Sequence, residues 1–135
     1  MSNFSLSTRS HERMKGVDHR LIDIANRAIE ITKIDFGIPQ YGGLRSTDNQ
    51  YRLFVEEKSK ADGYDKLSKH QSGKALDFFA YVDGKGSWEK EHLAQIAAAF
   101  LQAAIELNIK VRWGGLFSSW TDMPHIELIE DTELC

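Results

Sequence analysis

The chain has 135 residues, a formal net charge of −3, and hydrophobic and charged fractions of 41% and 27%. These values are typical of a globular chain of one-domain size, so residues 1–135 are expected to form one domain, with residues 1–9 and 130–135 flexible. Lys and Arg are scattered without a basic stripe, which argues against nucleic-acid binding. No apolar run is long enough for membrane insertion, and Cys135, the single cysteine, excludes an internal disulfide.

The N-terminal residues 1–7 have neither the basic start nor the apolar centre of a signal peptide. We therefore expect synthesis in the cytoplasm, which leaves the place of action open. A chain of this length can bury a core large enough to fold without a partner, so a monomer is expected.

Helical periodicity predicts one long amphipathic helix from Ser10 to Lys33. Its apolar positions recur every three or four residues, at Met14, Val17, Leu21, Ile24, Ala28 and Ile31. His11 and His19 lie off this stripe and are expected on the surface, as is His92 further along the chain. Asp35–Tyr41 alternates apolar with small or polar residues and predicts a strand, which Pro39 confines to a sheet edge or a bulge.

The rest of the chain predicts three more strands and two more helices. In order, these are a helix from Asp48 to Lys58 with Thr47 as its N-cap, a strand Lys74–Val82, a turn Asp83–Gly86, a helix from Ser87 to Leu107, and strands Ile109–Trp113 and Pro124–Ile129. This order predicts an α+β fold with a small, largely antiparallel sheet packed against helices.

The stretch from Ser68 to Asp77 combines residues that suit a metal site. His70 and Asp77 lie on either side of Gly73, where the backbone can fold back and bring them together. Asp77 would share a strand face with the apolar residues Phe79 and Tyr81, and a buried carboxylate needs a partner or a metal ion. Spacing alone leaves two interpretations open, a metal-binding pair and a structural His–Asp hydrogen bond.

A second stretch, residues 122–127, supplies further polar groups. His125 could be a third ligand, because two histidines and an aspartate can hold Zn²⁺ and leave its fourth position open. Asp122 could take a proton from a water molecule that zinc activates, or it is an ordinary loop aspartate. Glu127 shares the strand face of His125, as a support for that ring or as a partner for Lys or Arg. Arg45, after a Gly-Gly turn, could bind a substrate carboxylate.

The first stretch resembles the Ser-x-His-x-x-Gly-x-Ala-x-Asp signature of the D-Ala-D-Ala carboxypeptidase and dipeptidase family of zinc metallopeptidases, with all five fixed positions present. Asp122-x-x-His125 resembles the second signature of that family. Within the family the chain looks most like the phage endolysins of the L-alanyl-D-glutamate peptidase type, which share this aspartate and a Trp-Gly segment such as Trp113-Gly114. The resemblance covers about residues 21–128.

The resemblance implies that His70, Asp77 and His125 bind zinc on the sheet. It implies Asp122 as the general base and acid, and Arg45 as the anchor for a substrate carboxylate. The implied substrate is the peptidoglycan stem peptide, cut at L-Ala–D-Glu during host-cell lysis, with a separate holin giving access to the wall. Two alternatives stay open: a bacterial D-Ala-D-Ala carboxypeptidase or dipeptidase, and a zinc-stabilised binding module without catalysis.

Overall fold

The computed structural model describes residues 3–118 and 120–130, and within them the fold is α+β, as predicted. Its helices are α1 (Thr8–Arg13), α2 (His19–Ile31), α3 (Thr47–Val55) and α4 (Lys90–Glu106), with the 3₁₀ turns η1 (Lys69–Ser72) and η2 (Gly114–Leu116). Its strands are β1 (Asp35–Gly37), β2 (Ala75–Asp77), β3 (Phe79–Val82), β4 (Lys85–Ser87), β5 (Val111–Trp113) and β6 (His125–Leu128). They form two antiparallel sheets of three strands, β1-β3-β4 and β2-β6-β5, rather than one sheet.

The helix predicted from Ser10 to Lys33 is two helices. Gly16 adopts a left-handed φ of +84°, and Asp18 then caps α2 by accepting a hydrogen bond from the Arg20 N–H at 3.0 Å. Such a φ interrupts a right-handed helix, and an aspartate outside the helical region begins a new one. Met14 and Val17, on either side of the break, are both buried, so the apolar spacing of the sequence does not reveal the break.

The strand predicted over Lys74–Val82 is split at Phe78. Its first half, β2, pairs with β6, whereas its second half, β3, pairs with β1 and β4. The ring of Phe78 is fully buried and stacks on Phe100 with centroids 4.9 Å apart. Phe79 and Tyr81 are only half-buried, so they do not form the buried face that uninterrupted alternation around Asp77 predicted.

Smaller differences concern the ends of elements. Ser46, rather than Thr47, caps α3. The turn predicted before the third helix is a hairpin whose second strand is β4, so Ser87 lies in a strand and α4 begins at Lys90. Near the N-terminus Leu6 packs in the core. Residues 131–135, which include Cys135 and most of the segment 130–135 that was expected to be flexible, lie outside the described residues.

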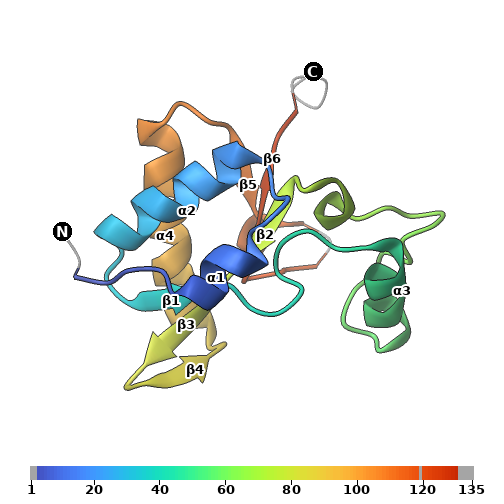
Figure 1. The fold of residues 1–135 in the computed structure, drawn as a ribbon, viewed down its shortest axis with the longest axis horizontal. Helices are drawn as coiled ribbons and strands as arrows, with labels where there is room; N and C mark the ends of the chain where they lie inside the picture. The colour runs from blue at the N-terminus through green and yellow to red at the C-terminus, as the bar shows by residue number, and fades with distance from the viewer. Residues whose placement is uncertain (1–2, 119, 131–135) are drawn as a thin grey trace.

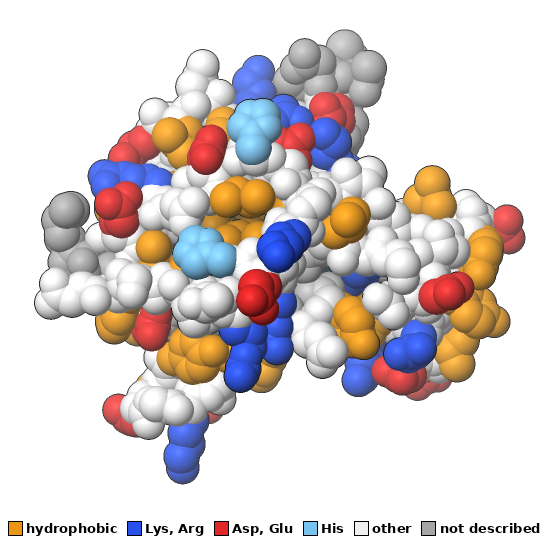
Figure 2. Space-filling model, viewed as in Figure 1, with side chains coloured by type: hydrophobic (Ala, Val, Ile, Leu, Met, Phe, Trp, Pro, Cys, Tyr) orange, Lys and Arg blue, Asp and Glu red, His pale blue; other side chains and the backbone are white. Residues whose placement is uncertain are grey.

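The helices α2 and α4 pack side by side, and α4 also contacts β3 and β5 (Figure 1). The core lies between these helices and the strands and contains, among other residues, Leu21, Ile24, Phe36, Phe78, Phe100 and Ile126. The helix α3 stands apart from this body (Figure 1), and hydrophobic side chains are exposed on its lobe (Figure 2), including Tyr51, Phe54 and Val55. Among the described residues, no helix is both long and apolar enough to cross a membrane.

Candidate metal centre

Three separate elements bring the predicted ligands together. Asp77 at the end of β2 lies directly opposite His125 at the start of β6 in the antiparallel ladder. His70 comes from η1, which Ser68 caps and which ends at Gly73 in the left-handed conformation. That glycine reverses the chain from η1 into β2, as the spacing predicted. The ring of His70 is buried, and that of His125 nearly so.

The facing donor atoms form a nearly equilateral triangle. Nε2 of His70 lies 3.3 Å from Nδ1 of His125, and each of these nitrogens lies 3.2 Å from Oδ1 of Asp77. A tetrahedral zinc ion with ligand bonds of about 2.0–2.1 Å would separate its ligand atoms by roughly 3.3–3.4 Å. The donor types and their spacing therefore fit one zinc ion with a fourth position left open.

Hydrogen bonds on the far side of each ring direct the lone pairs inward. Nδ1 of His70 lies 2.9 Å from the Gly43 carbonyl oxygen, which can only accept, so this nitrogen carries the proton. Nε2 of His125 lies 2.8 Å from Oε1 of Glu127 and donates to it. The nitrogens that face Asp77 are thus available as ligands, which is the arrangement typical of metal-binding histidines.

Three electron-rich atoms this close need a positive charge between them. Burial lowers the pKa of His125, but hydrogen bonds to Asp77 and Glu127 outweigh this effect and raise that pKa to about 10. Burial also acts to raise the pKa of Asp77, yet the two histidines hold it well below its usual range. A proton on His125 or a metal ion bound between the three atoms would supply this charge.

Arg45 lies beside the triangle and donates three hydrogen bonds to the protein. Its Nη2 donates to Oδ2 of Asp77 at 3.0 Å, its Nη1 to Oε1 of Gln50 at 3.1 Å, and its Nε to the Tyr41 carbonyl at 2.7 Å. Burial lowers the pKa of Arg45. These three bonds use three of the five N–H groups of the guanidinium and leave two for other partners. Arg45 therefore fixes the second carboxylate oxygen of Asp77, a contact that the sequence did not predict.

Asp122 reaches the same centre from the loop before β6. Its Oδ2 lies 3.8 Å from Nδ1 of His125. Burial and the negative charge of Asp77 raise the pKa of Asp122. Its backbone N–H donates to the Gly114 carbonyl at 2.9 Å, and the Trp113 indole donates to the Met123 carbonyl at 2.8 Å. The corner between β5 and η2 thus holds the Asp122 carboxyl close to the metal-binding triangle.

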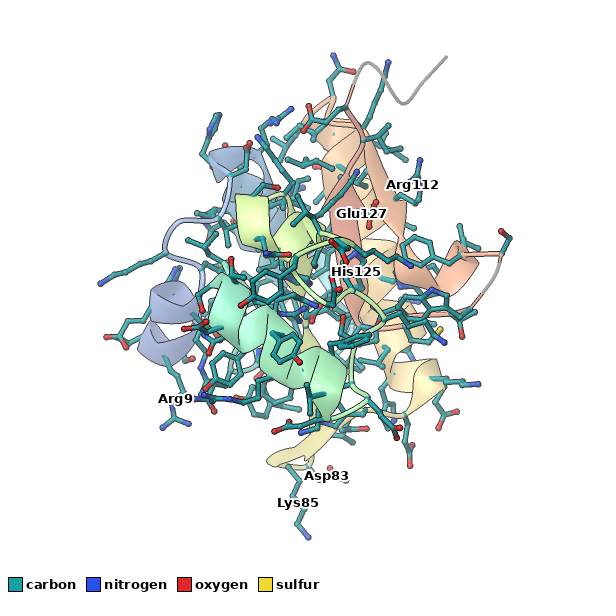
Figure 3. The ribbon with its side chains drawn as sticks, turned by 90° about the vertical axis from the view of Figure 1, so that its right-hand side faces the viewer. Arg9, Asp83, Lys85, Arg112, His125 and Glu127 are labelled. Carbon is teal, nitrogen blue, oxygen red and sulfur yellow. The ribbon has the colours of Figure 1, made fainter. Side chains whose placement is uncertain are left out.

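Glu127 supports His125 from the side away from the triangle. While Oε1 accepts from His125, Oε2 lies 3.2 Å from Nζ of Lys69 and 3.4 Å from Nη1 of Arg112. Figure 3 shows Glu127 between Arg112 and His125. The hydrogen bond to His125 and the nearby cations lower the pKa of Glu127, although its burial acts in the opposite direction. Of the two sequence interpretations, support for the ring and partnership with a basic residue, the structure shows both contacts.

The triangle opens into a groove of about 820 Å³. Arg45, Asp122 and the metal-binding group line part of it, and residues of α3 and the loop that follows form one wall. Trp88, Phe117 and Trp120 contribute aromatic surface. The groove can therefore admit a peptide-sized ligand to the three donor atoms.

One polar residue beside the site, Gln50, had no clear sequence signal. Gln50 is fully buried and joins Arg45 to the loop after α3 by donating to Ser59 Oγ and the Ala61 carbonyl, both at 2.8 Å. His11 and His19 are exposed as predicted, whereas His92 is half-buried and lies 2.7 Å from Ser87 Oγ.

Comparisons with known proteins agree with this fold and place the chain among small α+β peptidases. Residues 1–129 match the family model of the phage L-alanyl-D-glutamate peptidase, and the chain belongs to this family. It is 34% identical over 119 residues to the L-alanyl-D-glutamate peptidase of Escherichia phage T5, covering 83% of this chain and 80% of the relative.

A solved structure gives the same result. The crystal structure of the Serratia marcescens L-Ala D-Glu endopeptidase ChiX superimposes with a TM-score of 0.82 at 32% identity. The match covers 94% of this chain and 92% of that one. The three comparisons confirm the phage L-alanyl-D-glutamate peptidase type that the sequence resembles, and with it that the chain is a peptidase.

Proposed function

We propose that the protein is a zinc-dependent peptidoglycan endopeptidase that hydrolyses the L-Ala–D-Glu bond of the stem peptide. The single observation that carries the zinc dependence is the triangle of His70 Nε2, Asp77 Oδ1 and His125 Nδ1, with edges of 3.2–3.3 Å. The bond specificity is supported by the names of the phage T5 and Serratia relatives, which describe peptidases of that bond.

When bound, zinc would lower the pKa of a water molecule and polarise the scissile carbonyl group. Asp122 is the group of this chain that moves protons. Its carboxylate takes a proton from the attacking water and then gives it to the leaving amine of D-Glu. A carboxyl group with a raised pKa suits both steps, because it holds a proton more readily than an exposed aspartate does.

Arg45 has two roles in the proposed mechanism. It holds Asp77 through the 3.0 Å bond to Oδ2, and it offers its remaining N–H groups to the substrate in the groove. Glu127 keeps the His125 ring in place through the 2.8 Å bond to Nε2. These contacts hold the donor atoms before the substrate arrives, which lowers the reorganisation that the reaction requires.

The proposed setting is lysis of a bacterial host by a phage. The protein would be made in the host cytoplasm and would reach the wall after a separate holin has opened the membrane. It would act as a monomer, without binding nucleic acid or inserting into the membrane.

The alternatives predict different products. A D-Ala-D-Ala carboxypeptidase or dipeptidase releases D-Ala, whereas the proposed endopeptidase leaves L-Ala on the glycan and a D-Glu amino terminus on the released peptide. Mass spectrometry of digested muropeptides separates the two. A binding module without catalysis would give neither product, and it would not need the Asp122 carboxyl group beside the donor atoms.

A further inference from the structure

The groove has a wall whose charge the proposed reaction leaves unexplained. Residues 46–67, which contain α3 and the loop after it, carry four basic and five acidic side chains. All four basic ones, Arg52, Lys58, Lys60 and Lys66, line the groove. Of the five acidic ones, Glu56 alone lines it. We call the four cations the basic wall.

The basic wall is mostly unpaired. Lys58 lies 3.4 Å from Glu56 Oε1, but Arg52, Lys60 and Lys66 have no carboxylate partner among the described residues. Lys60 instead lies over the Trp120 ring, 5.8 Å from its centroid. The acidic residue Asp62 is turned into its own loop, where its side chain accepts from the N–H groups of Tyr64 and Lys66. A segment with a slight acidic excess therefore presents a positive surface to the groove.

The part of the groove beside the candidate metal centre differs, because its cations are paired. Asp77, Asp122 and Glu127 line it there together with Arg45, which lies 3.0 Å from Asp77, and Lys69, which lies 3.2 Å from Glu127. A ligand that fills the groove would thus meet paired charges beside the metal-binding group and unpaired cations on the basic wall. Charge complementarity requires the part of the ligand on the basic wall to be anionic.

A stem peptide has this asymmetry about the L-Ala–D-Glu bond. On the glycan side of the bond there is no free carboxylate, because the lactyl carboxyl group is used in the amide bond to L-Ala. On the other side, D-Glu is linked onward through its side-chain carboxyl group and keeps a free α-carboxylate unless it is amidated. A diamino acid at the next position can carry a second free carboxylate.

Given the proposed function, we propose that the basic wall binds free carboxylates on the D-Glu side of the scissile bond and makes the enzyme selective for stem peptides that are not amidated. The wall therefore also sets the direction of the substrate in the groove. The glycan-linked L-Ala lies away from α3, and the leaving peptide lies along it. Arg52, Lys60 and Lys66 are specificity-determining residues in this arrangement.

The test compares matched muropeptides with the zinc-loaded enzyme. One has free carboxylates, a second is amidated at the D-Glu α-carboxyl group, a third at the distal carboxyl group of the diamino acid, and a fourth at both. We expect kcat/KM to fall about tenfold in at least one amidated arm, the size that a few exposed charge pairs support together. The arm that loses activity identifies which carboxylate the wall binds.

A triple variant, Arg52→Gln with Lys60→Gln and Lys66→Gln, should cleave free and amidated muropeptides at similar rates. The control Lys85→Gln removes an exposed cation at the β3–β4 hairpin, away from His125 (Figure 3), and should keep the wild-type ratio. Equal cleavage of all four muropeptides by the wild type, or the same ratio in the triple variant, would overturn the proposal. Cleavage of none of them by the wild type would instead contradict the proposed function on which it depends.

Discussion

Nε2 of His70 and Nδ1 of His125 lie 3.3 Å apart, and each ring donates its other N–H to an acceptor, the Gly43 carbonyl or Glu127. Two ligand nitrogens are therefore held face to face by hydrogen bonds outside the metal-binding triangle. The outer acceptors, as well as the ligands, should determine how tightly the centre binds zinc.

Replacing the outer acceptor of His125 should weaken zinc binding. Glu127→Ala leaves Nε2 without its 2.8 Å acceptor and frees the ring to rotate. We expect zinc affinity to fall about 10–100-fold, measured by competition with a chelating dye, with a smaller loss for Glu127→Gln, which retains an acceptor oxygen. Glu106→Gln, a matched loss of an exposed carboxylate paired with Arg27, should leave zinc affinity unchanged, and a Glu127→Ala protein that behaves like it would disprove the supporting role.

A methyl group at Gly114 should disturb catalysis more than metal binding. A Cβ at this position would overlap the Asp122 carbonyl, so the loop that carries the proposed base must shift. A displacement of about 1 Å can cost roughly 10²-fold in rate, and we expect such a loss in kcat for Gly114→Ala, with one zinc ion still bound. Gly86→Ala, where a Cβ would meet only the Phe79 ring at 3.4 Å, serves as the control. Loss of zinc with kcat per bound zinc unchanged would refute a positioning role for Gly114.

Removal of Arg45 should destabilise the fold far more than removal of a surface arginine. Arg45→Ala leaves acceptors on Asp77, Gln50 and Tyr41 without their donor. A buried ion pair broken in this way costs about 3–5 kcal/mol of unfolding free energy. Arg27→Ala breaks the exposed pair with Glu106 and should cost far less, because solvent screens that pair. Urea unfolding of the metal-free proteins measures both, and equal losses would contradict the structural role of Arg45.

Asp18 should stabilise the protein at neutral pH but not in strong acid. Hydrogen bonds from Arg20 and Lys74, at 2.7–3.0 Å, lower the pKa of this carboxyl despite its burial. Because the folded pKa lies below the unfolded value of about 3.9, the stabilisation is full above that value and is lost as the pH falls toward the folded pKa. Asp18→Asn should cost about 1–3 kcal/mol at pH 7, and the difference should shrink below about pH 4. A difference that stays constant between pH 7 and pH 3 in thermal unfolding would show that this charge is not involved.

The proposed ligands were found from the sequence because their signal is local. His70, Gly73 and Asp77 lie within one short stretch, and a left-handed glycine between a 3₁₀ turn and a strand brings the two side chains together. His125 needed the second signature, since its contact with Asp77 depends on the β2–β6 register. Apart from the break in the first helix and the short strand β4, the order of helices and strands was likewise readable from periodicity and turn residues.

Other features depend on tertiary contacts that periodicity does not report. The break at Gly16 keeps Met14 and Val17 on one apolar face, so a continuous helix was predicted. Phe78 divides a strand whose residues on either side are almost all apolar. The hydrophobic pattern therefore does not show that the chain passes from one sheet to the other at this residue. Gln50 is buried only because Arg45 and the loop after α3 fold onto it, and a polar residue on a short helix gives no sign of this.

Product identification with zinc removed and restored tests the central claim most directly. Purified peptidoglycan is digested by the metal-free protein, by the same protein with one equivalent of zinc, and by zinc-treated His125→Ala, and the products are identified by mass spectrometry. The account predicts L-Ala left on the glycan and new D-Glu amino termini only in the sample of zinc-restored unmodified protein. Release of D-Ala, or the same products from the metal-free protein, would contradict it.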